Sequence, residues 1–193
     1  DVVLAGFLHD VGKAKFDQRL LEKNIETLEG DDYERYIQHT VDGAQILNRV
    51  AGLTEGVRLT ALQHHERMDG SGFPFNIKGD DIHLYARIVA VADLYDNITI
   101  EREGYTRRTP FDAVTEIARQ MYTSLDPAVC MPVLTNIKNA FLGSRVLLSN
   151  HREGTITAYP HGVVPLPIVT ISEDEIIDLN ENTDITILEY NPK

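Results

Sequence analysis

The sequence has few of the residues that mark secreted or membrane-spanning proteins. Its 193 residues include one cysteine, Cys130, and no tryptophan. A single cysteine excludes an intrachain disulfide, and a reducing compartment is the simplest setting, so we expect a cytoplasmic protein. No apolar run approaches the ~20 residues that a transmembrane helix requires, and no signal peptide is recognisable, so we expect no membrane insertion.

Positive charge is also scarce. The chain has 18 Lys and Arg against 30 Asp and Glu, which gives a formal net charge of -12. This balance argues against nucleic-acid binding, because such binding needs a positive surface that displaces counterions. An anionic substrate would therefore need a local basic pocket. The length and the 42% hydrophobic content suit one domain, or a domain with a small appendage.

Histidines and aspartates recur through an otherwise ordinary helical pattern. Imidazole nitrogens and carboxylate oxygens together are ligands of transition metals. Neighbours on a helix lie about 100° apart, so His9 and Asp10 can serve two ions only if the carboxylate bridges them. A lone histidine is more often structural. The alternative for the pair His64 and His65 is that a helix C-terminus favours the imidazolium form. We predict one metal centre formed by His9, Asp10, His39, His64, His65 and Asp93.

Asp93 supports this prediction independently. It lies in a strongly apolar segment, Leu84–Tyr95, that predicts a buried helix. A carboxylate in such a helix costs several kcal/mol unless a cation or a hydrogen bond compensates its charge. Arg87 precedes it by six residues and lies on a different part of the helix surface. A metal ion is therefore the better partner for Asp93.

Four motifs that contain these residues follow one another along the chain. They are His9-Asp10-Val11-Gly12-Lys13, His39-Thr40-Val41-Asp42-Gly43, His64-His65-Glu66-Arg67-Met68-Asp69-Gly70-Ser71-Gly72-Phe73-Pro74 and Ala92-Asp93-Leu94-Tyr95-Asp96. In this order and at these separations the chain resembles the HD-GYP family, the bacterial phosphodiesterase branch of the HD-domain metal hydrolases. The resemblance implies a mainly α fold, an HD-domain helical bundle.

The resemblance also implies a substrate and a mechanism. The substrate would be cyclic di-GMP, opened to pGpG and cleaved further to GMP where a third metal is present. Iron or manganese would be the metal, with zinc and nickel as alternatives. A hydroxide that bridges two ions would attack phosphorus, with Asp10 as the bridging carboxylate. Lys13 would neutralise a phosphate oxygen in the transition state; a solvated surface lysine is the alternative.

The resemblance places further substrate contacts in two segments. Gly72, Phe73 and Pro74 belong to a turn-rich loop beside the active site, where glycines permit close backbone approach. Phe73 stands where the family usually has tyrosine, so a hydroxyl hydrogen bond is lost. Arg102 and Arg107 fit the family's phosphate-binding segment best. That segment has an apparent extra residue and no proline here, and a displaced loop would change substrate affinity or choice.

The hydrophobic pattern divides the chain in two. Helices are expected over Asp1–Leu8, Tyr33–Val50, Thr54–Glu66, Leu84–Tyr95, from Pro110 onward and over Pro127–Leu142. After Gly143, β-branched runs separated by turn residues predict a small antiparallel β subdomain. We therefore expect a helical catalytic domain over residues 1–142 and a β appendage over residues 143–193, with His151 and His161 in its surface turns.

The resemblance implies more chain before residue 1. Family members carry an earlier helix that supplies another His ligand and, in some, a Glu for a third metal. The sequence given starts inside a helical pattern without an initiator Met, so we expect such a helix upstream. Family members are also usually fused to a sensor or receiver domain, which we expect here.

Three functional hypotheses follow from these observations. The first is a cyclic di-GMP phosphodiesterase. The second is an HD phosphohydrolase that acts on another nucleotide, such as a hybrid cyclic dinucleotide. The third is a degenerate domain that serves as a nucleotide sensor or docks to diguanylate cyclase (GGDEF) or adaptor domains. The altered segment around Arg102 favours the third, and the retention of all six predicted ligands counts against it. A purely structural domain would leave Asp93 unexplained.

Overall fold

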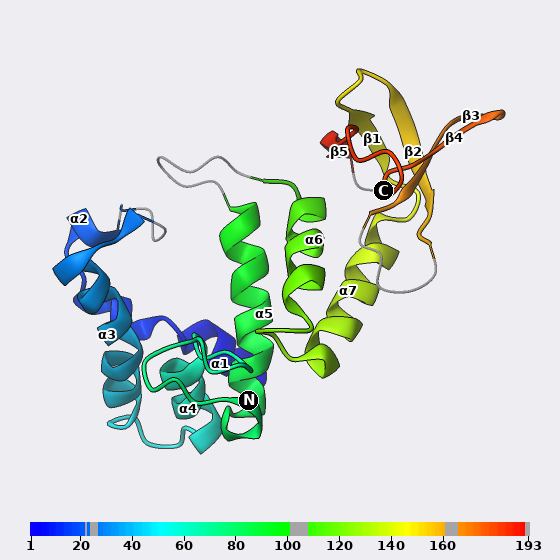
Figure 1. The fold of residues 1–193 in the computed structure, drawn as a ribbon. Coiled ribbons are helices and arrows are strands. Elements are labelled where there is room, and N and C mark those ends of the chain that lie inside the picture. The colour runs from blue at the N-terminus through cyan, green and yellow to red at the C-terminus, as the bar shows by residue number, and fades with distance from the viewer. Residues whose placement is uncertain (22, 24–26, 101–107, 161–165, 192–193) are drawn as a thin grey trace.

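The computed structural model describes the chain except for residues 22, 24–26, 101–107, 161–165 and 192–193 (Figure 1). The α-helices of the described part are α1 (Val2–Leu8), α2 (Gln18–Leu21), α3 (Gly30–Leu47), α4 (Glu55–Gln63), α5 (Leu84–Thr99), α6 (Pro110–Gln120) and α7 (Pro127–Phe141). Short 3₁₀ helices, η1 (Val11–Lys15) and η3 (Gly79–Asp81), lie between them. None of the helices in the described ranges has the length and apolarity needed to span a bilayer.

The helices follow one another in space as they do along the chain. Helix α3 packs on α4, α4 on α5, α5 on α6 and α6 on α7, while α1 lies against α4 and α5 (Figure 1). Two apolar clusters hold this row together. Ala5, Leu47 and Ala61 join α1, α3 and α4, and a larger cluster joins α5, α6 and α7. These clusters bury apolar residues of α3 to α7 between neighbouring helices, whereas Phe7 of α1 is exposed.

Local signals fix where α6 and α7 begin. Thr109 and Asp112 form a reciprocal capping box at the start of α6, which has proline in its first turn. The Asp126 side chain accepts a hydrogen bond from the backbone N–H of Ala128 and so caps α7. Asp126 also accepts a 2.9 Å hydrogen bond from Arg87 in α5. Arg87 thus pairs with α7 and not with Asp93, as expected from its position on α5.

The strands form an antiparallel sheet beyond α7 (Figure 1). They are β1 (Arg145–Leu148), β2 (Glu153–Ala158), β3 (Ile168–Ser172), β4 (Glu175–Asp178) and β5 (Ile187–Asn191), in the order β4-β3-β2-β1-β5. Buried side chains such as Leu148 and Ile156 pack with Phe111 of α6. The predicted fold class, mainly α with a small C-terminal antiparallel sheet, is confirmed.

The sequence pattern does not single out strand β4. Only Ile176 and Ile177 are apolar in β4, and Ile176 is 64% exposed. This segment is too short and too charged to produce a clear strand pattern. Its pairing with β3, where Ile177 lies opposite Val169, makes it a strand.

A close approach between η1 and α3 brings the first motif to the second. A Cβ atom at Gly12 would lie 1.9 Å from the carbonyl oxygen of His39 and 2.7 Å from the backbone nitrogen of Gly43. No side chain fits in this space, so glycine is required at position 12. The contact places Asp10 and Lys13, on either side of Gly12, beside His39.

We expect the Gly12→Ala variant to be destabilised. Its new methyl group would overlap backbone atoms of α3, and such overpacking lowers the free energy of unfolding by about 1–3 kcal/mol. Urea denaturation would measure the change. Gly6→Ala is the matched control, because its Cβ would meet only Val89 Cγ2 at 3.9 Å. That variant should be as stable as wild type or slightly more stable. Equal stability of the two variants would contradict the close contact.

Candidate metal centre

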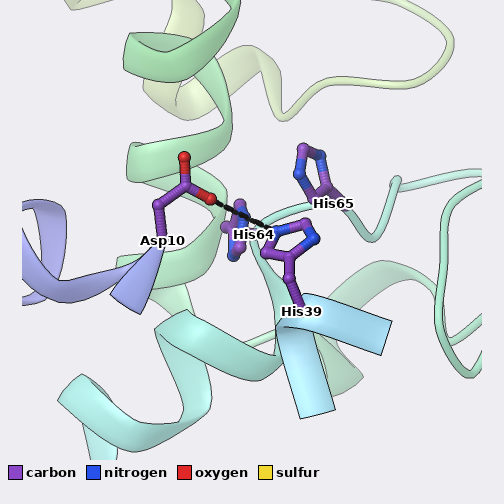
Figure 2. A group of neighbouring side chains, drawn as sticks. All are labelled: Asp10, His39, His64 and His65. Atoms are coloured by element: carbon purple, nitrogen blue, oxygen red, sulfur yellow. Dashed lines mark hydrogen bonds and ion pairs between the residues drawn. The ribbon is translucent and has the colours of Figure 1, made fainter. Parts of the chain in front are cut away.

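The six predicted ligands converge where α1, α3, α4 and α5 meet. Their donor atoms form two groups, and within each group all donor atoms lie within 4.8 Å of one another. Asp10 belongs to both groups; Figure 2 shows it facing the three histidines of the first. The first group is Asp10, His39, His64 and His65, and the second is His9, Asp10 and Asp93.

The two oxygens of Asp10 face different partners. Its Oδ1 lies 3.2 Å from His39 Nε2 and 3.5 Å from His64 Nε2. Its Oδ2 lies 3.4 Å from His9 Nε2. Asp93 Oδ1 lies 3.7 Å from the same nitrogen of His9. This is the arrangement that a carboxylate shared by two ions requires.

Three of the histidines are oriented by backbone carbonyls one turn earlier. Nδ1 of His9 donates to the carbonyl of Gly6 at 2.6 Å. Nδ1 of His39 donates to the carbonyl of Tyr36, and Nδ1 of His64 lies 3.1 Å from that of Thr60. In a neutral ring the nitrogen that donates carries the only hydrogen, so Nε2 then has its lone pair. Each Nε2 is therefore available as a ligand atom, with its ring held by the second hydrogen bond.

Two buried atoms of the cluster lack hydrogen-bond partners in the described part of the chain. They are His9 Nε2, in the second group, and Asp10 Oδ1, which faces His39 and His64 of the first. A buried polar atom left unsatisfied costs about 1–3 kcal/mol. A divalent cation in each group would compensate both atoms. Nitrogen and oxygen donors in this mixture suit divalent transition metals.

The electrostatics of the cluster favour a cation. Burial alone would raise the pKa of Asp10, but nearby imidazoles, led by that of His39, and the Lys13 ammonium hold it far below its usual range. Burial alone would lower the pKa of His9, but the carboxylates of Asp10 and Asp93 raise it to about 10. A proton on His9 thus balances the carboxylates, and an ion bound there would displace it.

The pKa values of His64 and His65 are shifted in the opposite direction from that of His9. Burial lowers the pKa of the His64 imidazole, and burial with the neighbouring imidazoles lowers that of His65 well below its ordinary value. Both rings are therefore neutral near pH 7, the form in which imidazole binds metal ions.

Lys13 lies at the centre and not on the open surface. Its Nζ donates to Asp10 Oδ2 at 2.5 Å, and its side chain is 23% exposed. The same ammonium lies 5.5 Å from the centroid of the Tyr36 ring. The structure thus places the predicted phosphate-binding lysine next to the shared carboxylate.

The predicted substrate loop also reaches the centre. A Cβ atom at Gly72 would lie 2.3 Å from the carbonyl oxygen of His65, so the loop backbone packs directly on the histidine pair. The Phe73 ring stacks on that of His65, with centroids 4.5 Å apart and planes at 28°. Pro74 follows Phe73 and is partly buried. Arg102 and Arg107 lie outside the described residues.

The sequence prediction missed three residues that support the centre. Tyr36 contacts His65 through its hydroxyl. Glu66 is buried and accepts a 2.8 Å hydrogen bond from the backbone N–H of Phe75, which ties the loop to the histidine pair. Arg67 donates to the carbonyl of His64 at 3.1 Å. The sequence offered one signal for these supporting roles: Glu66 and Arg67 follow the histidine pair, and Tyr36 lies one helical turn before His39.

The chain is similar to several known proteins. The HD domain family profile matches residues 1–129. The cyclic di-GMP phosphodiesterase PA4108 of Pseudomonas aeruginosa is 31% identical over 153 residues, which cover 79% of this chain and 36% of that protein. The 3'3'-cGAMP-specific phosphodiesterase 3 of Vibrio cholerae is 31% identical over 136 residues, which cover 70% of this chain and 29% of that protein.

A further relative and one solved structure are also similar to this chain. The cyclic di-GMP phosphodiesterase response regulator RpfG of Xanthomonas campestris is 38% identical over 127 residues, which cover 65% of this chain and 33% of that protein. The solved structure of Bd1817, a HDG"Y"P protein from Bdellovibrio bacteriovorus, superposes with a TM-score of 0.58 at 20% identity, over 72% of this chain and 43% of that one. This likeness shows the shared fold. The chain spans about a third of the length of these curated relatives.

We expect two aspartate variants to differ in metal content. Asp10→Ala removes the carboxylate that both groups share, so it should lose both ions. Asp93→Ala alters only the second group and should keep one ion. Elemental analysis after equilibration with Mn²⁺ would count them.

The matched control is Asp42→Ala, since Asp42 pairs with Lys15 outside both groups. It should bind as many ions as wild type. Full metal content in Asp10→Ala would contradict the shared position of Asp10.

Proposed function

This chain belongs to the HD domain family, and we propose that it is a metal-dependent phosphodiesterase that hydrolyses cyclic di-GMP to pGpG. The observation that carries the proposal is the Asp10 carboxylate, which faces two groups of imidazole and carboxylate donors and accepts a hydrogen bond from Lys13. The names of several relatives, which are cyclic-dinucleotide phosphodiesterases, support the substrate class. Further cleavage to GMP belongs to the same proposal.

HD domains bind divalent metals, and we propose two ions of iron or manganese here. One would be held by Asp10 with His39, His64 and His65, the other by His9, Asp10 and Asp93. When bound, such ions polarise phosphate oxygens and lower the pKa of a water molecule.

The protein's own residues would bind and orient the phosphodiester. Lys13 contributes a positive charge beside the shared carboxylate, in a chain whose net charge is -12. The Lys13 ammonium would attract a negatively charged phosphate oxygen. Gly72, Phe73 and Pro74 would line the nucleotide side of the site, because the loop packs on His65. We propose that Arg102 and Arg107 add phosphate contacts.

The domain assignment remains part of the proposal. All proposed ligands lie between α1 and α5, and the last of them is Asp93. We therefore assign catalysis to residues 1–142 and treat residues 143–193 as an appendage. An upstream receiver or sensor domain fits the response-regulator name of RpfG and the longer chains of the relatives.

The direct test is product analysis with two substrates. The chain, extended by the expected upstream helix, would be purified anaerobically, loaded with Mn²⁺ or Fe²⁺, and incubated with cyclic di-GMP or 3'3'-cGAMP. We expect pGpG from cyclic di-GMP at the higher rate. Faster cleavage of 3'3'-cGAMP would support the second candidate, favoured by the names of the Vibrio relatives. Bound metal without turnover of either would contradict a phosphodiesterase and favour a sensor.

We expect Lys13→Ala to retain its metal ions and to lose activity. The lysine does not belong to either donor group, so the Mn²⁺ content should equal that of wild type. Loss of a preorganised charge at the transition state should lower kcat by about 100-fold. Steady-state hydrolysis of cyclic di-GMP measures this.

Lys15→Ala provides the control, since Lys15 is 51% exposed and pairs with Asp42. It should show wild-type kcat. An equally active Lys13→Ala enzyme would exclude the proposed role of Lys13.

A further inference from the structure

We propose that Tyr36 is a positioning residue of the metal centre, which orients His65 through its hydroxyl and Lys13 through its ring. The inference rests on the proposed function, because it assigns a role within the same site. Tyr36 is not a ligand candidate. It belongs to α3, one helical turn before His39, and is 4% exposed.

His65 differs from the other three histidines in how its ring is held. The rings of His9, His39 and His64 donate to backbone carbonyls of their own helices, and no side-chain substitution removes those acceptors. The hydrogen bond found for His65 joins its Nε2 to the Tyr36 hydroxyl at 3.2 Å. The orientation of His65 thus depends on another side chain.

The Tyr36 ring is itself fixed on several sides. Its centroid lies 4.9 Å from that of His39, 6.0 Å from that of Phe73 and 6.4 Å from that of Phe16. The backbone carbonyl of Tyr36 also accepts the hydrogen bond from His39 Nδ1. A ring confined in this way holds its hydroxyl at one position, so His65 is enclosed between Tyr36 and the stacked ring of Phe73.

The ring has a second, separable role at Lys13. The Lys13 ammonium lies 5.5 Å from the ring centroid, within the range of a cation–π interaction. The same ammonium donates to Asp10 Oδ2. The ring face therefore directs Lys13 toward the shared carboxylate, while the hydroxyl acts on His65. Removal of the hydroxyl should leave the contact with Lys13 intact.

The test compares Tyr36→Phe with Tyr36→Leu. Tyr36→Phe retains the ring and should weaken Mn²⁺ binding by roughly 10- to 100-fold, the usual cost of losing a residue that orients a metal ligand. Isothermal titration with Mn²⁺ alone measures this without turnover. The visible absorption spectrum of the Co²⁺-loaded protein should also change, which reports a changed ligand field directly. In Tyr36→Leu, Lys13 also loses its ring contact, so kcat should fall further at saturating Mn²⁺.

The matched control is Tyr33→Phe. Tyr33 belongs to the same helix but is 43% exposed, and it should bind Mn²⁺ and Co²⁺ as wild type does. Wild-type or tighter Mn²⁺ affinity in Tyr36→Phe, with an unchanged Co²⁺ spectrum, would overturn this inference and leave the proposed function standing. A wild-type chain that binds no Mn²⁺ would overturn the proposed function, and this inference with it.

Discussion

The shared carboxylate of Asp10 is the interaction on which the site depends. Each of its oxygens faces a different set of imidazoles, and Lys13 donates to one of them. Its position follows from backbone packing, because the 3₁₀ helix η1 approaches α3 at Gly12 more closely than any side chain would allow. A contact between two backbone segments thus positions the carboxylate around which the other ligands are arranged.

The other ligands are largely buried, and each has a nearby partner for its charge or its hydrogen-bonding group. Asp93 lies in an apolar helix, where its charge is balanced by His9. His39 and His64 are fully buried, and backbone carbonyls of their own helices satisfy their Nδ1 atoms. Burial in turn keeps His64 neutral. The same helix packing that forms the core therefore orients the rings and sets the charge of the cluster.

Helical periodicity, a local property, predicted the helices. The residue types of the six ligands and the family resemblance of their motifs predicted one metal centre. The sequence also predicted that Arg87 does not pair with Asp93. Arg87 instead donates a hydrogen bond to Asp126. The sequence did not predict β4, whose two isoleucines become a strand only through pairing with β3. Nor did it identify Tyr36 or Glu66 as supporting residues. The Tyr36 hydroxyl contacts His65 of another segment, and Glu66 accepts a hydrogen bond from the backbone of the following loop. Tertiary contacts of this kind leave no periodic pattern.

Two ions that share Asp10 would be visible by anomalous diffraction from crystals grown with Mn²⁺. We expect two anomalous peaks about 3.5–4 Å apart, with Asp10 between them, His39 and His64 on one side and His9 and Asp93 on the other. A single peak, or two peaks of which only one contacts Asp10, would contradict a shared Asp10.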